Sequence, residues 1–182
     1  MTDTVFIATE SFGPQNGQRW LSYFEWAKIP QVEEVVSLDF MLNPRIVTRL
    51  IDEDWAHIVN VDYRLSYFTD LPYMLSRIPT GVPCNVLGLY RNPEYHIQEP
   101  PSSGFYTFIG YDLLEEQTQI SALTNCGGFT ASFSNTELNQ FGLITDFQLA
   151  DEISYSLRVN NPDDPHVDCE LYAIWRLKEP VK

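Results

Sequence analysis

Residues 105–129 read FYTFIGYDLLEEQTQISALTNCGGF, and this stretch decides the fold. Two strand-like runs, 105–114 and 119–125, flank the polar segment 115–118, which is long enough to close an antiparallel hairpin. The first run is almost wholly apolar or aromatic, so both faces of that strand should be covered. The pattern breaks at residues 125–128, Asn-Cys-Gly-Gly, where the strand would leave the sheet. A functional site, if there is one, is expected at this break.

Outward from the hairpin, the sequence predicts a single α+β domain over residues 1–182, with a mainly antiparallel central sheet and packed helices. In residues 167–177 every second side chain from Val167 to Trp175 is apolar, a period-two pattern typical of a strand with one strongly apolar face. The predicted sheet contains residues 84–90, 105–114, 119–125 and 167–177. A further short strand is expected at 5–8. The 182 residues are 44% hydrophobic, and no linker divides them.

Several sequence patterns predict helices. Aromatic residues at helical spacing predict a helix over 20–27, and Asp70 is a plausible N-cap for one over 71–78. The pair Asn43-Pro44 has the form of an N-cap followed by the first residue of a helix extending to residue 51. Two capping boxes follow the hairpin, one formed by Ser134 with Glu137 and one by Thr145 with Gln148.

The cysteines and the N-terminal sequence indicate a cytoplasmic protein. Cys84, Cys126 and Cys169 are odd in number and lack paired CxxC spacing, so neither a disulfide framework nor a zinc ribbon is suggested. No basic segment precedes an apolar one at the N-terminus, and no apolar run is long enough to span a bilayer. We therefore expect reduced thiols and no membrane partner.

The charge is strongly and unevenly negative. The formal net charge is −14, and no Lys or Arg occurs between Arg91 and Arg158. Such a field repels phosphate, so nucleic acid is a poor partner and a basic protein is the natural complement. An equally open interpretation is that the acidity only maintains solubility. If a basic partner binds, the candidate contact residues are Glu94, Glu99, Asp112, Glu115 and Glu116.

The main candidate for a catalytic site is a set of three residues, Cys126, His166 and Asp168. A thiol followed by two glycines leaves backbone N–H groups available as oxyanion donors. An imidazole could favour the thiolate, and a carboxylate could orient the ring. The alternative is that Cys126 is a small buried apolar residue before a glycine turn.

Two groups resemble metal sites, but their positions disfavour metal binding. Residues 52–54 with His57 have a ligand-like spacing, yet three carboxylates at a helix start are also what the helix dipole favours. The second group is Cys126, His166 and Cys169; in a strand His166 and Cys169 point to opposite faces, which disfavours a shared ion. No nucleotide-binding motif is present. We expect neither a metal nor a cofactor.

Three functional hypotheses result. The first is an acidic cytosolic binding module, for example an inhibitor or immunity-type protein that masks a basic partner. The second is a cysteine-dependent hydrolase or transferase that uses Cys126, His166 and Asp168. The third is a non-enzymatic structural or regulatory protein.

Overall fold

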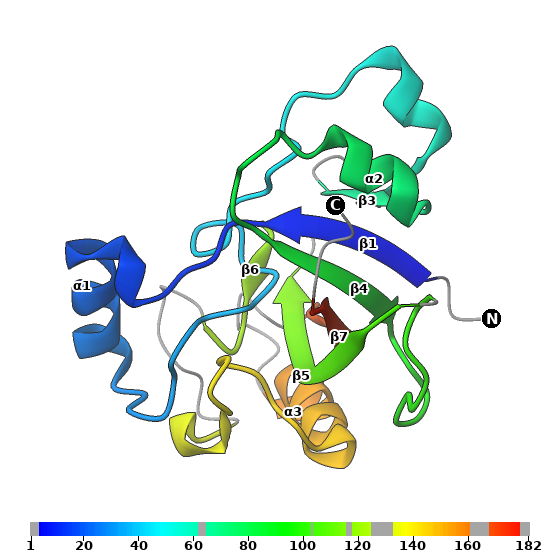
Figure 1. Ribbon diagram of the computed structural model, residues 1–182. Helices are drawn as coiled ribbons and strands as arrows, with labels where there is room; N and C mark the ends of the chain where they lie inside the picture. Colours follow the sequence, from blue (N-terminus) through cyan, green and yellow to red (C-terminus); the bar gives the residue numbers. More distant parts are fainter. Residues whose placement is uncertain are drawn as a thin grey trace.

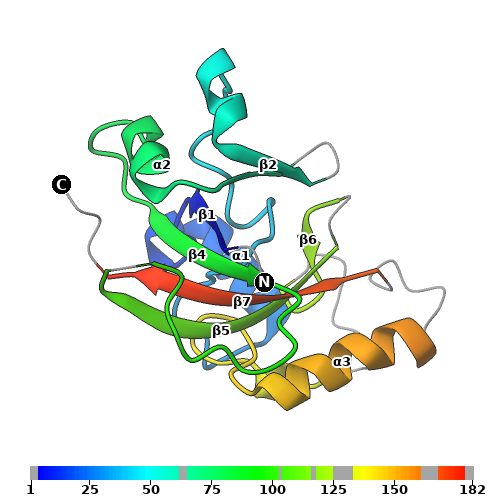
Figure 2. The ribbon, with the colours of Figure 1, turned by 90° about the vertical axis from the view of Figure 1, so that its right-hand side faces the viewer.

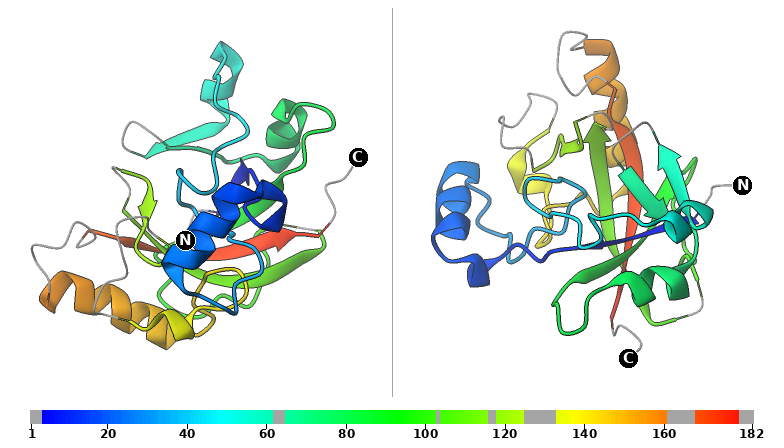
Figure 3. Two further views of the ribbon diagram at one scale, coloured as in Figure 1. Left: turned by 90° about the vertical axis from the view of Figure 1, so that its left-hand side faces the viewer. Right: turned by 90° about the horizontal axis from the view of Figure 1, so that it is seen from above.

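In the computed structural model, residues 4–61, 65–102, 104–115, 118–124, 133–160 and 168–178 are described. They form one curled sheet of seven antiparallel strands, in the order β2-β3-β1-β4-β7-β5-β6, accompanied by three α-helices (Figures 1 and 3). The predicted α+β fold with an antiparallel sheet is confirmed.

The elements have the following bounds. The strands are β1 (Thr4–Thr9), β2 (Ile58–Val61), β3 (Leu65–Phe68), β4 (Asn85–Arg91), β5 (Tyr106–Glu115), β6 (Ile120–Ser121) and β7 (Glu170–Leu177). The α-helices are α1 (Gln18–Ala27), α2 (Leu71–Arg77) and α3 (Phe147–Asn160). Three 3-10 helices are η1 (Pro14–Asn16), η2 (Asp52–Ala56) and η3 (Asn135–Glu137).

Strand β7 occupies the position that its alternating sequence predicts, between two partners. Trp175 lies opposite Gly88 of β4 on one side and opposite Phe108 of β5 on the other. Five consecutive residues of β7, 171–175, are buried. Both faces of the strand are therefore covered, and not only the one face that the alternation predicted. The predicted strands 84–90, 105–114 and 167–177 are thus all present and adjacent in the sheet.

The predicted hairpin also forms, but its second strand is short. Leu114 pairs with Ser121 and Glu115 with Ile120, after which the ladder ends. The Ser121 hydroxyl accepts hydrogen bonds from the backbone N–H groups of Leu123 and Thr124, at 3.1 and 3.3 Å. These bonds offer the backbone a turn in place of a strand. The expected strand over 119–125 is therefore reduced to β6.

Three strands extend the sheet beyond the four that were predicted to form it. Strand β1, expected as a short strand over 5–8, pairs with both β3 and β4 and buries Val5 to Ala8. Strands β2 and β3 form an antiparallel pair at the edge, with Ile58 opposite Phe68. Each has only four residues, which is too short for a clear periodic pattern.

The helices lie on different parts of the sheet. Helix α3 packs against β5 and β7, and α2 packs against β1 and β3 (Figure 2). Helix α1 lies to one side of the sheet (Figure 1), where Trp20 and Tyr23 contact the buried Phe12 ring edge-on, at centroid distances of 5.5 and 5.4 Å. Trp20 and Tyr23 are therefore core, as their helical spacing predicts, whereas Trp26 of the same helix is 42% exposed.

Two of the predicted helix caps are confirmed. Asp70 accepts a hydrogen bond from the N–H of Tyr73 across 2.7 Å at the start of α2. At the start of η3, the N–H of Ser134 donates to the Glu137 carboxylate at 2.6 Å, which completes a capping box. Both motifs depend only on residues three positions apart.

Two other helix predictions are wrong in detail. No helix begins at Asn43, because its buried amide donates to the carbonyls of Glu10 and Val35, at 3.0 and 2.9 Å. At α3 the capping carboxylate belongs to Asp146, which accepts from the N–H of Leu149 at 2.8 Å. The Thr145 hydroxyl instead accepts from the Asn139 amide at 3.2 Å.

Candidate functional site

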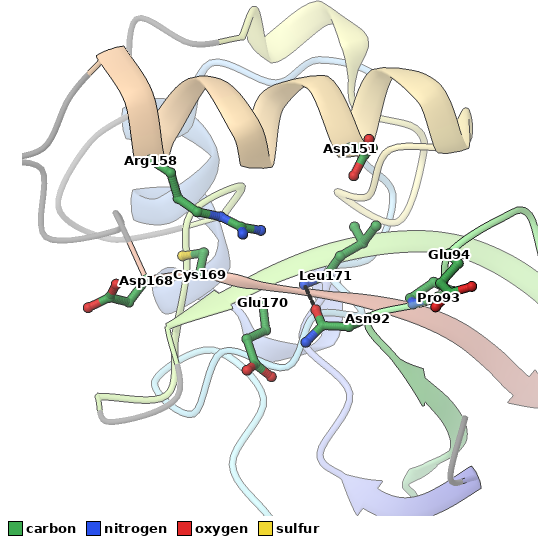
Figure 4. Close-up of a pocket in the computed structure, with 9 residues that line it drawn as sticks. All are labelled: Asn92, Pro93, Glu94, Asp151, Arg158, Asp168, Cys169, Glu170 and Leu171. Carbon is green, nitrogen blue, oxygen red and sulfur yellow. Dashed lines mark hydrogen bonds between the residues drawn. The ribbon is translucent and has the colours of Figure 1, made fainter. Parts of the chain in front are cut away.

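A hollow of about 460 Å³ lies between α3 and the first residues of β7 (Figure 4). Asp151 and Arg158 both face it, because seven positions make nearly two turns of helix. The chain that follows β4 closes the hollow on a second side. The described residues that line it are Asn92, Pro93, Glu94, Asp151, Arg158, Asp168, Cys169, Glu170 and Leu171.

Asn92 holds the chain after β4 against β7. Its N–H donates to the Leu171 carbonyl at 2.7 Å, and its side-chain oxygen accepts from the Leu171 N–H at 3.1 Å (Figure 4). Its backbone is left-handed, with φ of 45°, a conformation that asparagine tolerates better than most residues. The chain therefore turns sharply here and brings Glu94 to the rim.

The charge around this hollow, here named the acidic hollow, is mainly negative. Glu94, Asp151 and Asp168 are exposed carboxylates. Glu170 forms an ion pair with Arg91, whose Nη2 lies 2.7 Å from the Glu170 carboxylate. Of the described lining residues only Arg158 is basic, and its guanidinium donates to the Ser154 hydroxyl on its own helix, at 2.9 Å. The acidic hollow is therefore suited to a positively charged group.

A second, aromatic hollow of about 710 Å³ lies at the start of α3. The described residues that line it are Tyr95, His96, Phe108, Thr145, Asp146, Phe147 and Gln148. His96 Nδ1 lies 2.6 Å from the hydroxyl oxygen of Tyr111, a fully buried residue of β5. This contact fastens the 92–98 loop to the sheet.

The structure leaves the proposed catalytic set untested. Cys126 and His166 lie outside the described residues. Asp168 is exposed at the acidic hollow, beside the buried Cys169. The three-residue mechanism therefore stays a prediction.

The candidate contact residues fall into three groups. Glu94 is exposed at the acidic hollow, and Glu99 is exposed at a third hollow, together with Tyr90 and Tyr95. Glu116 lies outside the described residues. Asp112 and Glu115 are buried, at 0% and 6% exposure, so they cannot belong to a contact surface.

Both buried carboxylates have structural roles. Asp112 accepts hydrogen bonds from the Leu38 N–H at 2.7 Å and from the Ser121 hydroxyl at 2.5 Å. Glu115 accepts from both the N–H and the hydroxyl of Thr118, across the hairpin turn. A carboxylate that receives several donors in this way can remain buried.

In the acidic segment at residues 52–54, Asp54 forms an ion pair with Arg77. Asp54 is buried, and its carboxylate lies 2.7 Å from Arg77 Nε and 2.9 Å from the Tyr73 hydroxyl. It also accepts from the N–H of Ile51 at 2.8 Å, which caps η2. Within the described ranges, no three His, Cys, Asp or Glu side chains form a group that could hold a metal ion.

Four residues on α3 that line a further hollow were missed by reasoning from the sequence. Asp151, Glu152, Tyr155 and Arg158 surround a small hollow of about 310 Å³, and the Tyr155 side chain is 66% exposed. Their positions within two turns of a well-marked helix could have identified them. Tyr95 and His96 could not be connected to α3 in the same way, because that contact is long-range.

Comparison with models of protein families, with curated proteins and with solved structures finds no match to this chain. No helix in the described ranges is both long and apolar enough to cross a membrane.

Proposed function

We propose that this chain is an acidic cytosolic protein without catalytic activity that binds and masks a basic surface of a partner protein, as an inhibitor or immunity protein does. The contact surface, here named the acidic face, consists of Glu94, Asp151, Glu152, Tyr155 and Asp168. The observation that carries the proposal is the hollow of about 460 Å³ with three exposed carboxylates at its rim. A lysine or arginine side chain is its complement, because its stem can lie against Pro93 and Leu171.

The acidic face stays mainly negative because the described residues that line its hollows include one basic side chain, Arg158, and several other arginines are engaged within the fold. The guanidinium of Arg45 is buried, with its Nη2 donating to the Leu38 carbonyl at 3.1 Å. Three ion pairs engage further arginines, namely Arg77 with Asp54, Arg91 with Glu170 and Arg176 with Glu34. A field of one sign steers an oppositely charged partner and accelerates association.

Tyr155 supplies the apolar component that a stable interface needs. It is 66% exposed beside Asp151 and Glu152, and Val159, one turn further along α3, is 54% exposed. Exposed tyrosines often become the energetically dominant residues of protein interfaces, whereas rim charges mainly affect the association rate and its salt dependence. We expect a basic partner to cover Tyr155 and surround it with Lys and Arg.

The test is affinity capture from the native lysate at low and high salt with two matched triple variants. The first removes charge from the acidic face through Glu94→Gln, Asp151→Asn and Glu152→Gln. The second removes the same charge elsewhere through Glu10→Gln, Glu25→Gln and Glu53→Gln, all of them exposed residues. We expect the unaltered chain and the second variant to capture the same basic protein at low salt. The first variant should lose it by about tenfold or more, and high salt should weaken every complex.

Recovery of no basic protein at either salt would overturn the proposal, as would equal capture by both variants. Association that neither salt nor the variants affect would instead support a structural or regulatory protein. Tyr155→Ala separates the two components of the surface. It should weaken binding while leaving the salt dependence unchanged.

A further inference from the structure

The aromatic hollow at the start of α3 differs from the acidic face in its chemistry. Its described lining contains four rings, those of Tyr95, His96, Phe108 and Phe147, and one carboxylate, that of Asp146. None of the described residues that line it is a lysine or an arginine. A ligand here would meet ring surfaces and a single negative charge.

Tyr111 forms the base on which three of these rings are fixed. Phe108 and Phe147 contact its ring edge-on, with centroid distances of 5.1 and 5.6 Å. The His96 ring is edge-on to Phe108, with a centroid distance of 5.3 Å and an interplanar angle of 81°. Since Tyr111 is fully buried, its neighbours are fixed before any ligand arrives.

A contact with Tyr111 holds the His96 ring at the edge of the hollow. His96 Nδ1 lies 2.6 Å from the Tyr111 hydroxyl oxygen. Burial raises the pKa of Tyr111 to about 12, so this hydroxyl keeps its proton at neutral pH.

Tyr95 differs from Phe108 and Phe147 because it is more exposed. Its side chain is 67% exposed, and it belongs to the loop that His96 fastens to the sheet. A ring in this position can contact a bound group with little rearrangement of the core.

The charge in the hollow favours a cation over an anion. One Asp146 oxygen accepts from the Leu149 N–H, so the side chain already occupies the helix start, where an anion would otherwise bind. A single carboxylate provides too few ligands for a hard metal ion. Aromatic rings with one carboxylate are the groups that recognise organic ammonium ions.

We propose that the hollow lined by Tyr95, His96, Phe108, Asp146 and Phe147 is a binding site for an organic ammonium group, either of a small molecule or of a lysine side chain, methylated or not. The proposal does not depend on the acidic face, because it concerns a different hollow with different residues. The rings would surround the cation, and Asp146 would balance its charge.

Isothermal titration of the whole chain with choline at constant ionic strength tests this site. The neutral control is 3,3-dimethylbutan-1-ol, which has the same shape without the charge. We expect choline to bind at least about tenfold more tightly. Acetylated lysine amide and its trimethylated form, titrated in parallel, show whether the ammonium group can come from a side chain.

Two pairs of variants connect binding to the named residues. Asp146→Asn keeps an N-cap that can accept from Leu149 but removes the charge, so it should weaken choline binding about threefold or more while α3 persists by circular dichroism. Tyr95→Leu should weaken binding similarly, whereas Tyr95→Phe should not. Equal affinity for choline and the neutral alcohol would overturn the proposal. Choline binding that neither Asp146→Asn nor Tyr95→Leu changes would also overturn it.

Discussion

The carboxylate of Asp112 accepts a hydrogen bond from the backbone N–H of Leu38, across 2.7 Å and 74 sequence positions. The same side chain binds the Ser121 hydroxyl, and Ser121 N–H donates to Asp39 at 3.1 Å. Asp39 also accepts from the N–H groups of Met41 and Leu42. These two buried aspartates therefore tie the 37–42 loop to the β5–β6 hairpin.

This arrangement predicts an unusual pH dependence of stability. Burial raises the pKa of Asp112 to about 6, and burial likewise raises the pKa of Asp39. Because the folded chain holds the Asp112 proton more tightly, the cost of ionising Asp112 is absent below about pH 4 and complete above about pH 6. The raised pKa of Asp39 acts in the same direction. For Asp112 alone, that cost is about 3 kcal/mol.

The measurement compares urea unfolding of the unaltered chain with that of Asp112→Asn between pH 4 and pH 7. As the pH rises, the difference in unfolding free energy should shift in favour of the variant by up to about 3 kcal/mol. Most of the shift should occur between pH 4 and pH 6. Parallel pH profiles for the two proteins would show that Asp112 does not titrate in this range.

The Asp54–Arg77 pair has the opposite pH dependence. The hydrogen bonds from Arg77 lower the pKa of Asp54 to about 2. Its contribution to stability is therefore complete above the ordinary carboxyl pKa of about 4 and is lost as the pH falls toward 2. Arg77→Met leaves the buried carboxylate without its partner and should cost about 1–3 kcal/mol at pH 7.

Arg49→Met is the matched control for Arg77→Met. Arg49 is exposed, and its backbone carbonyl, which accepts from Arg77, is unchanged by the substitution. Its unfolding free energy should lie within about 0.5 kcal/mol of the unaltered chain. If both variants lost the same stability, the loss would not come from the ion pair.

The parts of the fold that could be predicted from the sequence depend on local information. The alternation in residues 167–177 and the caps at Asp70 and Ser134 need only neighbours within a few positions, and each appears where expected. Asn43 was wrongly predicted to cap a helix, because its side-chain amide instead donates a hydrogen bond to the carbonyl of Glu10, 33 positions away.

The candidate site was harder to predict for the same reason. Asp112 has the charge of a surface residue, and only the fold reveals the Leu38 donor that allows its burial. Glu94 was correctly expected at the surface. Its approach to Asp151 follows from how α3 packs beside the chain after β4, which no local pattern encodes.

Gly110 marks a bulge in β5 that only glycine fits. Its φ is +138°, and a Cβ there would lie 2.7 Å from Leu143 Cβ and 2.9 Å from the Ile144 carbonyl oxygen. Gly110→Ala should therefore lower the unfolding free energy by about 2–4 kcal/mol, from backbone strain together with overpacking.

Gly81→Ala is the control that measures backbone strain without overpacking, since the φ of Gly81 is +79° and no atom lies near its Cβ position. That control should cost only about 1–2 kcal/mol. Equal losses in urea unfolding would mean that the strand can shift to admit a side chain at position 110.

The cysteine-dependent mechanism makes a prediction that can be tested by thiol labelling. Cys169 is 3% exposed, and burial raises the pKa of Cys84, so both should react slowly with iodoacetamide at neutral pH. If Cys126 is a nucleophile activated by His166, it should be alkylated well before the other two in a time course read by peptide mass spectrometry. His166→Ala should then slow the alkylation of Cys126 by about tenfold or more, because the thiolate would lose the imidazole that favours it. Asp168→Asn should slow this alkylation less, since Asp168 would only orient the ring.

Fast labelling of Cys126 that persists in His166→Ala would indicate simple exposure of the thiol. Equal and slow labelling of all three cysteines would remove the mechanism and leave residues 125–128 as a turn.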